Sequence, residues 1–195
     1  MLNDAIQLFV SLGNPGEAYT HTRHNIGAWW LKYLATELNA IMRTEPKFQG
    51  QMAKVICHDF PIFLFQPDTF MNLSGHPVRA ISQFYQIPPK AILVIHDELD
   101  FSAGITRLKQ GGGHGGHNGL RNIIQCLGTP DFYRLRIGIG HPEDRGEVHD
   151  YVLGRPSQSD TSLILAAIHQ SMLILPALVQ GNIEKAMQTL HTPKL

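Results

Sequence analysis

Ala91-Ile92-Leu93-Val94-Ile95 is an uninterrupted apolar run, and the polar stretch His96-Asp97-Glu98-Leu99-Asp100 follows it at once. Five consecutive apolar residues between Pro88-Pro89 and a polar loop are typical of a buried central strand in an α/β sheet. Ligand sites in such sheets lie beyond the carboxyl ends of the strands. The run therefore predicts both the centre of the fold and the place of Asp97 in a cleft.

The remaining patterns alternate between strands and helices along the chain. Further strands are predicted at residues 7–12, 52–57, 62–66, 105–109 and 135–139, the second and third as a hairpin. Helices are predicted at residues 25–38, 77–85, 120–127, 160–180 and 183–190, with Ser74 as an N-cap. Pro176 is expected to kink a core helix whose apolar stretch, residues 163–179, is too interrupted for a membrane span. The order of elements predicts a single α/β domain over residues 1–195, with a central twisted mixed β-sheet surrounded by helices.

The composition excludes several classes of protein. The 195 residues carry a formal net charge of zero, so the chain as a whole does not indicate nucleic-acid binding. Residues 105–136 nevertheless hold five basic side chains against one acidic one, which would suit a polyanion that docks on one face. The two cysteines are too few for a disulfide framework, and the start of the chain lacks a basic signal region. These features predict a cytoplasmic protein.

Residues Gly111 to Gly119 read Gly-Gly-Gly-His-Gly-Gly-His-Asn-Gly, which is a poor interior for any helix or strand. Such a loop can bring bare backbone N–H groups close to a ligand. Arg107 and Lys109 precede it and a helix follows, so the segment predicts a phosphate-binding corner. The alternative is a flexible surface loop.

Polar residues with chemical capacity sit at the predicted element boundaries, namely Asn14, His24, Asn72, Asp97 and Asn118. Each alone is explained equally well as a cap, a turn residue or a loop carboxylate. As a set they contain the groups for hydrolysis of an activated acyl bond by water. A carboxylate can orient a histidine base, and amides can hold a carbonyl or a water. Burial and a nearby carboxylate would shift the pKa of such a histidine in opposite directions.

Other chemistries are less well supported. The chain has no Gly-x-Ser-x-Gly elbow and no phosphate-binding Gly-x-x-x-x-Gly-Lys-Ser/Thr motif. Gly111-x-Gly113-x-x-Gly116 formally matches a dinucleotide fingerprint, but about 20 residues later the chain has Arg136 where that site needs an acid. The pairs His21/His24 and His114/His117 are weak metal signals in a chain with 11 histidines. No metal or cofactor is predicted.

Six segments together resemble the bacterial-type peptidyl-tRNA hydrolase family. They are residues 12–16 (Leu-Gly-Asn-Pro-Gly), 22–25 (Thr-Arg-His-Asn), 70–75 (Phe-Met-Asn-Leu-Ser-Gly), 96–100, 111–120 and 134–142. They run in the family's order across most of the chain. The resemblance implies a cytosolic, monomeric, cofactor-independent esterase with no membrane association. It would cut the ester between a peptide and the 3′ ribose of tRNA.

The resemblance also implies roles for individual residues. His24 would be the general base and Asp97 its orienting partner. The amides of Asn14, Asn72 and Asn118 would hold the peptide carbonyls and the attacking water, with Tyr19, Phe70 and Met71 as walls of the cleft. Lys109 and Arg136 would bind the terminal phosphate of tRNA, with Arg107 and His117 nearby. Arg107 stands where the family often has lysine, which keeps the charge and changes the geometry of a phosphate contact.

Two other classes of function remain open at this level. A non-catalytic RNA-binding protein of the same fold would keep the basic corner without needing Asn14, His24 and Asp97 together. An esterase or amidase for small molecules would not need Lys109 and Arg136 beside a glycine loop.

Overall fold

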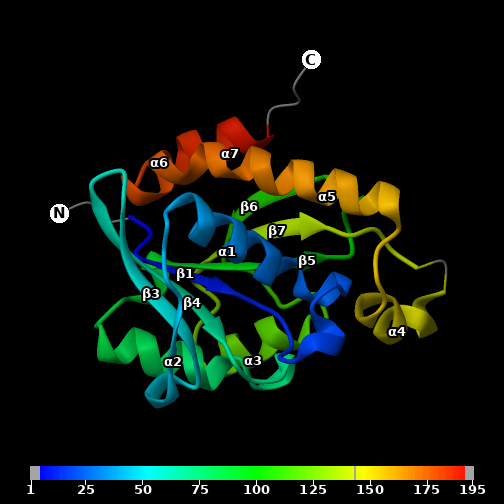
Figure 1. Ribbon diagram of the computed structural model, residues 1–195, viewed down its shortest axis with the longest axis horizontal. Helices are drawn as coiled ribbons and strands as arrows, with labels where there is room; N and C mark the ends of the chain where they lie inside the picture. The colour runs from blue at the N-terminus through cyan, green and yellow to red at the C-terminus, as the bar shows by residue number, and fades with distance from the viewer. Residues whose placement is uncertain (1–4, 143, 192–195) are drawn as a thin grey trace.

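A computed structural model describes residues 5–142 and 144–191 (Figure 1). The strands are β1 (Leu8–Ser11), β2 (Arg43–Glu45), β3 (Gly50–Cys57), β4 (Phe60–Pro67), β5 (Ile92–Glu98), β6 (Thr106–Gln110) and β7 (Tyr133–Gly138). The α-helices are α1 (Ile26–Glu37), α2 (Gly75–Phe84), α3 (Asn118–Leu127), α4 (Val148–Leu153), α5 (Gln158–Ser171), α6 (Leu175–Val179) and α7 (Ile183–His191).

The strands form one mixed sheet in the order β2-β3-β4-β1-β5-β7-β6. The four central strands β4, β1, β5 and β7 are parallel, whereas β2, β3 and β6 join antiparallel at the two sides. Helices cover both faces of this sheet in a single domain (Figure 1). The predicted fold class is confirmed.

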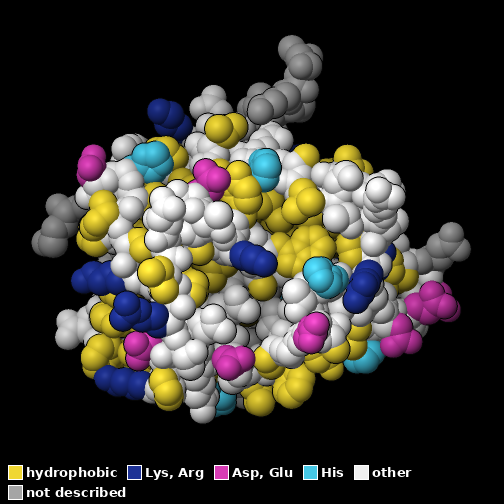
Figure 2. Space-filling view, viewed as in Figure 1, with side chains coloured by type: hydrophobic (Ala, Val, Ile, Leu, Met, Phe, Trp, Pro, Cys, Tyr) yellow, Lys and Arg dark blue, Asp and Glu magenta, His cyan; other side chains and the backbone are white. Residues whose placement is uncertain are grey.

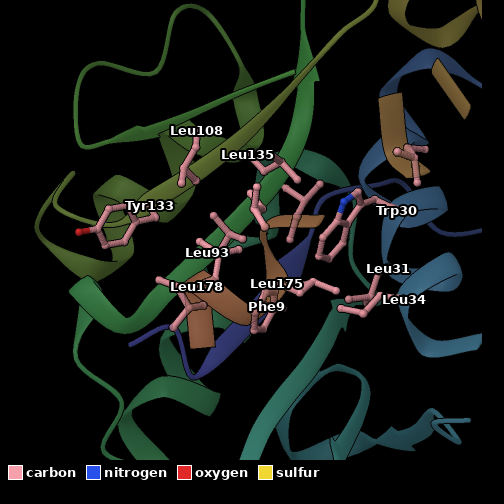
Figure 3. Packing of buried hydrophobic residues seen from close by; sticks show 14 of the residues in the cluster. Phe9, Trp30, Leu31, Leu34, Leu93, Leu108, Tyr133, Leu135, Leu175 and Leu178 are labelled. Carbon is pink, nitrogen blue, oxygen red and sulfur yellow. The ribbon is translucent and has the colours of Figure 1, made fainter. Parts of the chain in front are cut away.

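Two apolar clusters lie on opposite faces of the sheet. On one face, Phe9, Leu93 and Leu135 from the strands meet Trp30 of α1 and Leu178 of α6 (Figure 3). On the other face, side chains of β1, β4 and β5 pack under α2 and α3. Because side chains of a strand alternate between faces, a strand covered on both sides reads as the continuous apolar run seen in β5.

Strand β5 is longer than its apolar run. It continues through His96 and Asp97 to Glu98, because β7 supplies pairing partners along this stretch. Asp97 therefore lies on the strand itself, whereas the sequence predicted that it lies in a loop after the strand. Ladder hydrogen bonds hold its backbone more firmly than a loop would.

The hairpin prediction is correct, and its turn is shorter than expected. Strands β3 and β4 pair from Gly50↔Pro67 to Cys57↔Phe60, leaving the two-residue turn His58-Asp59. Both turn residues have positive φ, 47° and 69°, as a type I′ turn requires.

Ser74 stands at the predicted N-cap position of helix α2, but its side chain does not cap the helix. Its backbone is helical, and its Oγ donates to the carbonyl of Met71 at 2.9 Å, so it belongs to the preceding turn. The first N–H of α2, on Gly75, instead donates to Oδ1 of Asn122 on α3 at 2.7 Å. A tertiary contact thus replaces the local cap.

Pro176 begins a helix and does not kink one. Helix α5 ends at Ser171, a 3-10 turn follows, and α6 starts at Leu175 with Pro176 in its first turn. Proline fits there because that turn needs no N–H donor. By length and composition alone, Gln158–Val179 would be long and apolar enough to cross a membrane, with 50% of its most apolar window buried in the protein. A core helix meets the same criterion, and this stretch contributes Ile168, Ile174 and Leu178 to the core.

Gly27 allows α1 to lie against the strands that carry the site. A Cβ at this position would come within 2.5 Å of the carbonyl oxygen of Ile95 and 2.6 Å of that of Leu12. We expect Gly27→Ala to lower the free energy of unfolding by about 2 kcal/mol or more, because backbone atoms cannot yield as side chains do. Urea denaturation measures this. Gly113→Ala is the control, because a Cβ there has nothing within 4 Å. Equal stability of both variants would contradict the close packing of α1.

Candidate active site

A cleft of about 1250 Å³ opens where the parallel strands end. Eleven of the side chains predicted for the site line it: Asn14, Tyr19, His24, Phe70, Met71, Asn72, Asp97, Lys109, His117, Asn118 and Arg136. Arg107 is not among the lining residues. It is half-buried on β6, where its Nη1 donates to the carbonyl of Thr106. The prediction that the boundary residues face one cleft therefore agrees with the structure, with Arg107 set beside it.

A buried histidine–carboxylate pair lies in the cleft. His24 sits in the turn before α1, and its Nδ1 donates to Asp97 Oδ1 at 2.9 Å and Oδ2 at 3.0 Å. With its proton on Nδ1, the ring keeps an unshared electron pair on Nε2. No described residue bonds to that atom, so it is available to a ligand.

His117 shares the same carboxylate from the other side. Its Nδ1 accepts the N–H groups of Gly119 at 3.1 Å and Leu120 at 3.4 Å, and so caps the start of α3. Because Nδ1 accepts, the ring proton is on Nε2, which donates to Asp97 Oδ1 at 3.1 Å. The cap thereby links the glycine loop to the His24–Asp97 pair.

The charges in this cluster shift the pKa values strongly. Burial lowers the pKa of His24, but the charge and hydrogen bonds of Asp97 raise it by more, so it lies above 6.5. Burial raises the pKa of Asp97, yet His24 and His117 hold it well below 3.8. Burial, and next the neighbouring His117, lower the pKa of His96 to about 3. Asp97 is therefore ionised at neutral pH and His96 uncharged.

Two asparagines have their amide groups oriented by neighbours. Oδ1 of Asn14 accepts the N–H of Met71 at 2.8 Å, and the backbone of Asn14 is bound in both directions by the side chain of Asn25. Oδ1 of Asn118 accepts from Arg121 at 3.1 Å. In both cases the amide oxygen is occupied and the NH₂ group is left to donate into the cleft. Asn72 lines the cleft as an exposed side chain.

The glycine loop lies over the face of the sheet, and Arg134 holds it there. The buried guanidinium of Arg134 on β7 donates to the carbonyls of Gly112 and Gly113 at 2.6 and 2.5 Å. Gly111, Gly112, Gly115 and Gly116 all have positive φ, which explains the need for glycine. The loop is therefore tied to the sheet and is not a free surface loop.

Basic side chains of β6 and β7 lie at the floor of the cleft. Lys109 pairs across the ladder with Arg134, and Arg107 pairs with Arg136, so all four point to the same face. Arg136 is bound through Nε to Glu98 at 2.8 Å and lies 4.4 Å from the centre of the Phe101 ring. Elsewhere, basic and acidic side chains are interspersed on the face shown in Figure 2. His117 already binds two N–H groups at the start of α3. An anion at the predicted phosphate-binding corner would therefore meet mainly the side-chain cations.

Sequence reasoning missed several residues of the site. Arg134 lies in the basic segment and in the family-like segment 134–142 but had no predicted role, although its position two residues before Arg136 signals a shared face of one strand. His96 is buried beside His117, with ring centres 5.0 Å apart. Val148 and Val152 of α4 form another wall of the cleft. The six-residue helix α4 has too short a pattern to be recognised in the sequence.

The chain is similar to known proteins over nearly its full length. The family model for peptidyl-tRNA hydrolase matches residues 8–195. A peptidyl-tRNA hydrolase of Coxiella burnetii is 53% identical over 191 residues, covering 98% of this chain and 100% of that protein. One from Methylobacillus flagellatus is 50% identical over 189 residues, covering 97% and 98%. A crystal structure of the enzyme from Acinetobacter baumannii superimposes with a TM-score of 0.95 at 44% identity, covering 98% of this chain and 97% of that one.

Fold and cleft together define a single-domain α/β protein with a basic cleft around a histidine–carboxylate pair. The chain belongs to the peptidyl-tRNA hydrolase family, as its matches over nearly the full length show. It is an enzyme that hydrolyses the ester bond of peptidyl-tRNA, with a role in translation.

Proposed function

We propose that His24 is the general base of this hydrolysis and that Asp97 orients and charges it. The observation that carries the proposal is the pair of hydrogen bonds from His24 Nδ1 to Asp97, at 2.9 and 3.0 Å. They leave Nε2 as the basic atom inside the cleft. The carboxylate also stabilises the imidazolium that forms once the ring has taken a proton.

The reaction proceeds by direct attack of water. Nε2 of His24 takes a proton from a water molecule as its oxygen bonds to the ester carbonyl carbon. The tetrahedral intermediate then breaks its bond to the 3′ oxygen of the ribose. The proton on His24 passes to that oxygen, which releases tRNA and leaves the peptide with a free carboxyl group.

Amide donors stabilise the negative charge of the intermediate in this proposal. No described residue bonds to the NH₂ groups of Asn14 and Asn118, and Met71 and Arg121 fix the two amides through their oxygens. Donors held in place before the reaction cost no reorganisation when charge develops. Asn72 is assigned to the peptide carbonyls, and Tyr19, Phe70 and Met71 to the walls that contact the peptide. Tyr19 and Phe70 pack edge to face, with ring centres 6.3 Å apart.

We assign the RNA end of the substrate to the floor of β6 and β7. Lys109 and Arg136 line the cleft and would bind the terminal phosphate, with Arg107 beside them and His117 at the junction with the catalytic pair. Glu98 holds Arg136 through Nε, which presets its guanidinium for a phosphate. Arg107 adds positive charge near this phosphate site from outside the cleft.

We further propose that the reaction needs no metal or cofactor. His24, Asp97 and His117 place three potential ligand atoms within 4.8 Å of one another. Binding a metal at Nε2 of His117 would move its proton to Nδ1, where it would face the N–H groups of Gly119 and Leu120. The helix cap thus favours a hydrogen-bonded chain over a metal site. We also propose that the enzyme acts in the cytoplasm, and the free thiols at Cys57 and Cys126 support this location. In this proposal it works as a monomer and does not bind a membrane.

The test compares N-acylated aminoacyl-tRNA with free aminoacyl-tRNA as substrates, in the presence of EDTA. We expect fast cleavage of the acylated substrate only, at a rate that EDTA does not change. Loss of activity in EDTA that added metal restores would refute the metal-free reaction. Equal cleavage of both substrates would refute recognition of the peptide by the cleft.

Lys109→Ala is expected to weaken tRNA binding more than it slows the chemical step. A lysine that contacts one phosphate contributes about one unit to the slope of log affinity against log salt concentration. Titration of labelled tRNA at several salt concentrations measures this slope. Lys54→Ala removes an exposed lysine of β3 that does not line the cleft, and serves as the control. An unchanged affinity across the salt series would refute the assignment of Lys109.

A further inference from the structure

Arg23 joins the turn that carries His24 to the helix α4. Its Nη1 donates to the backbone carbonyls of Arg155 at 2.9 Å and Tyr151 at 3.2 Å. Its guanidinium lies 4.0 Å from the centre of the Tyr151 ring. Its backbone N–H donates to the carbonyl of Gly154 at 3.0 Å. One residue thus holds the carboxyl end of α4 through four contacts.

These contacts place a cation where the helix needs one. The carboxyl end of a helix carries unpaired carbonyls and a partial negative charge, which an arginine satisfies directly. With six residues, α4 is too short to be stable by itself, so its position depends on such anchors. The side chain of Arg23 is only 11% exposed, and the carboxylate of Asp160 lies 4.0 Å away. Figure 1 shows α4 at the edge of the molecule, beside the first turns of the chain.

The anchored helix forms a wall of the catalytic cleft. Val148, Val152 and Leu153 line the cleft that His24 also lines, whereas Arg23 does not line it. Any influence of Arg23 on the reaction must therefore pass through α4 or through the turn of His24. Asp97 holds the His24 ring independently, so the Arg23 side chain acts mainly on α4. It shares this task with the Tyr151 hydroxyl, which donates to the carbonyl of Ile139 at 2.7 Å, and with the buried side chain of Val152.

We propose that Arg23 is a positioning residue for peptidyl-tRNA hydrolysis, which fixes the apolar wall that α4 contributes to the cleft of His24 and thereby sets the affinity for substrate. This inference rests on the proposed role of His24. A substrate bound in the cleft against this wall loses contacts when α4 moves away. The chemical step keeps its base and its orienting carboxylate.

The test is a set of steady-state kinetics on N-acylated aminoacyl-tRNA with Arg23→Gln and Arg23→Lys. We expect KM to rise about tenfold in Arg23→Gln, with kcat changed less than twofold. The pH at which activity is lost on the acid side should stay as in the native enzyme. The KM of Arg23→Lys should lie between those of the native enzyme and Arg23→Gln, because lysine keeps the charge but not the planar guanidinium. Loss of folded protein would behave differently, since it lowers the apparent kcat and leaves KM unchanged.

Arg155→Ala is the matched control, because this exposed arginine contributes only its backbone carbonyl to the contact with Arg23. It removes a positive charge from the same region and should leave KM unchanged. Arg23→Ala should also raise KM. Millimolar methylguanidinium should lower the KM of this variant, whereas sodium chloride at the same ionic strength should not.

An unchanged KM in Arg23→Gln, or an equal rise in Arg155→Ala, would overturn the proposal. A rise in KM that methylguanidinium does not reverse would also count against it. If His24→Ala stays active, the proposed role of His24 fails, and this outcome is independent of the KM values in the Arg23 series.

Discussion

Replacing His24 with alanine is expected to lower kcat about 10³-fold, within the range that a general base contributes. The reason is geometric. Of the two imidazoles bonded to the Asp97 carboxylate, His24 is the one whose other nitrogen has no described partner, since Nδ1 of His117 caps α3. His96 Nε2 is also without a described partner, but it is buried, and a pKa of about 3 makes it a weak base. Water without a base attacks an ester slowly, even when amide donors remain in place to stabilise the intermediate. Substrate affinity should change little, since the cations and walls of the cleft are untouched.

Single-turnover kinetics on N-acylated aminoacyl-tRNA, with a parallel binding titration, separates these two effects. His21→Ala is the matched control, because His21 is exposed three residues earlier and does not line the cleft. Near-normal turnover of a folded His24→Ala variant would end the proposed mechanism. A comparable loss in His21→Ala would mean that the turn, and not the imidazole, matters.

Replacing Asp97 with asparagine is expected to lower kcat by about 10²-fold and to move the acid limb of the pH profile to lower pH. In the native protein Asp97 outweighs burial and holds the pKa of His24 above 6.5. Asparagine removes the negative charge while burial remains, so the pKa of His24 must fall. The reaction needs the neutral ring, and activity therefore persists to lower pH. The rate at the plateau drops because a less basic imidazole accepts a proton less readily.

The pH dependence of kcat in the native enzyme and the variant gives the loss of rate at the plateau. That of kcat/KM gives the position of the acid limb, since it reports ionisations of the free enzyme. Asp100→Asn provides the control, because this exposed carboxylate lines the same cleft without bonding to His24. An acid limb that stays in place or moves to higher pH in Asp97→Asn would contradict the assignment. A shift of the acid limb of equal size in Asp100→Asn would show that the overall negative charge of the cleft, and not the contact with Asp97, sets the pKa of His24.

Much of the fold could be predicted because the main elements carry strong local patterns. The apolar run of β5 reflects burial on both faces of the sheet, and the helical spacing of Trp30 and Leu34 reflects burial of one face of α1. The ends of the elements were less predictable. Strand β5 continues into polar residues because β7 pairs with them, and no local pattern records a partner that lies 40 residues later.

Short elements depended on tertiary structure altogether. Strand β2 consists of the polar residues Arg43, Thr44 and Glu45, and it exists because the edge of β3 offers free backbone groups. Helix α4 exists where Arg23 caps it. The first N–H of α2 is satisfied by Asn122 and not by Ser74. In each case the stabilising group is remote in sequence, and propensity reports only near neighbours.

The candidate site shows the same division. The residue types and their places at element boundaries, His24, Asp97, Asn14 and Asn118 among them, were readable from the sequence because sheet topology brings strand ends together. Which nitrogen carries the proton in each histidine, and how each amide is oriented, could not be read from the sequence. Both depend on Met71 and Arg121 occupying amide oxygens and on the N–H of Gly119 meeting Nδ1 of His117.

The sequence by itself thus determined the class of fold and the inventory of chemical groups in the cleft, since hydrophobic periodicity and residue type are local properties. Tertiary structure alone decided which nitrogen of His24 is basic, which amide groups can donate, and where Arg134 ties the glycine loop. Hydrogen bonds are directional, and their partners here come from separate segments of the chain. Only the folded arrangement brings those partners within bonding distance.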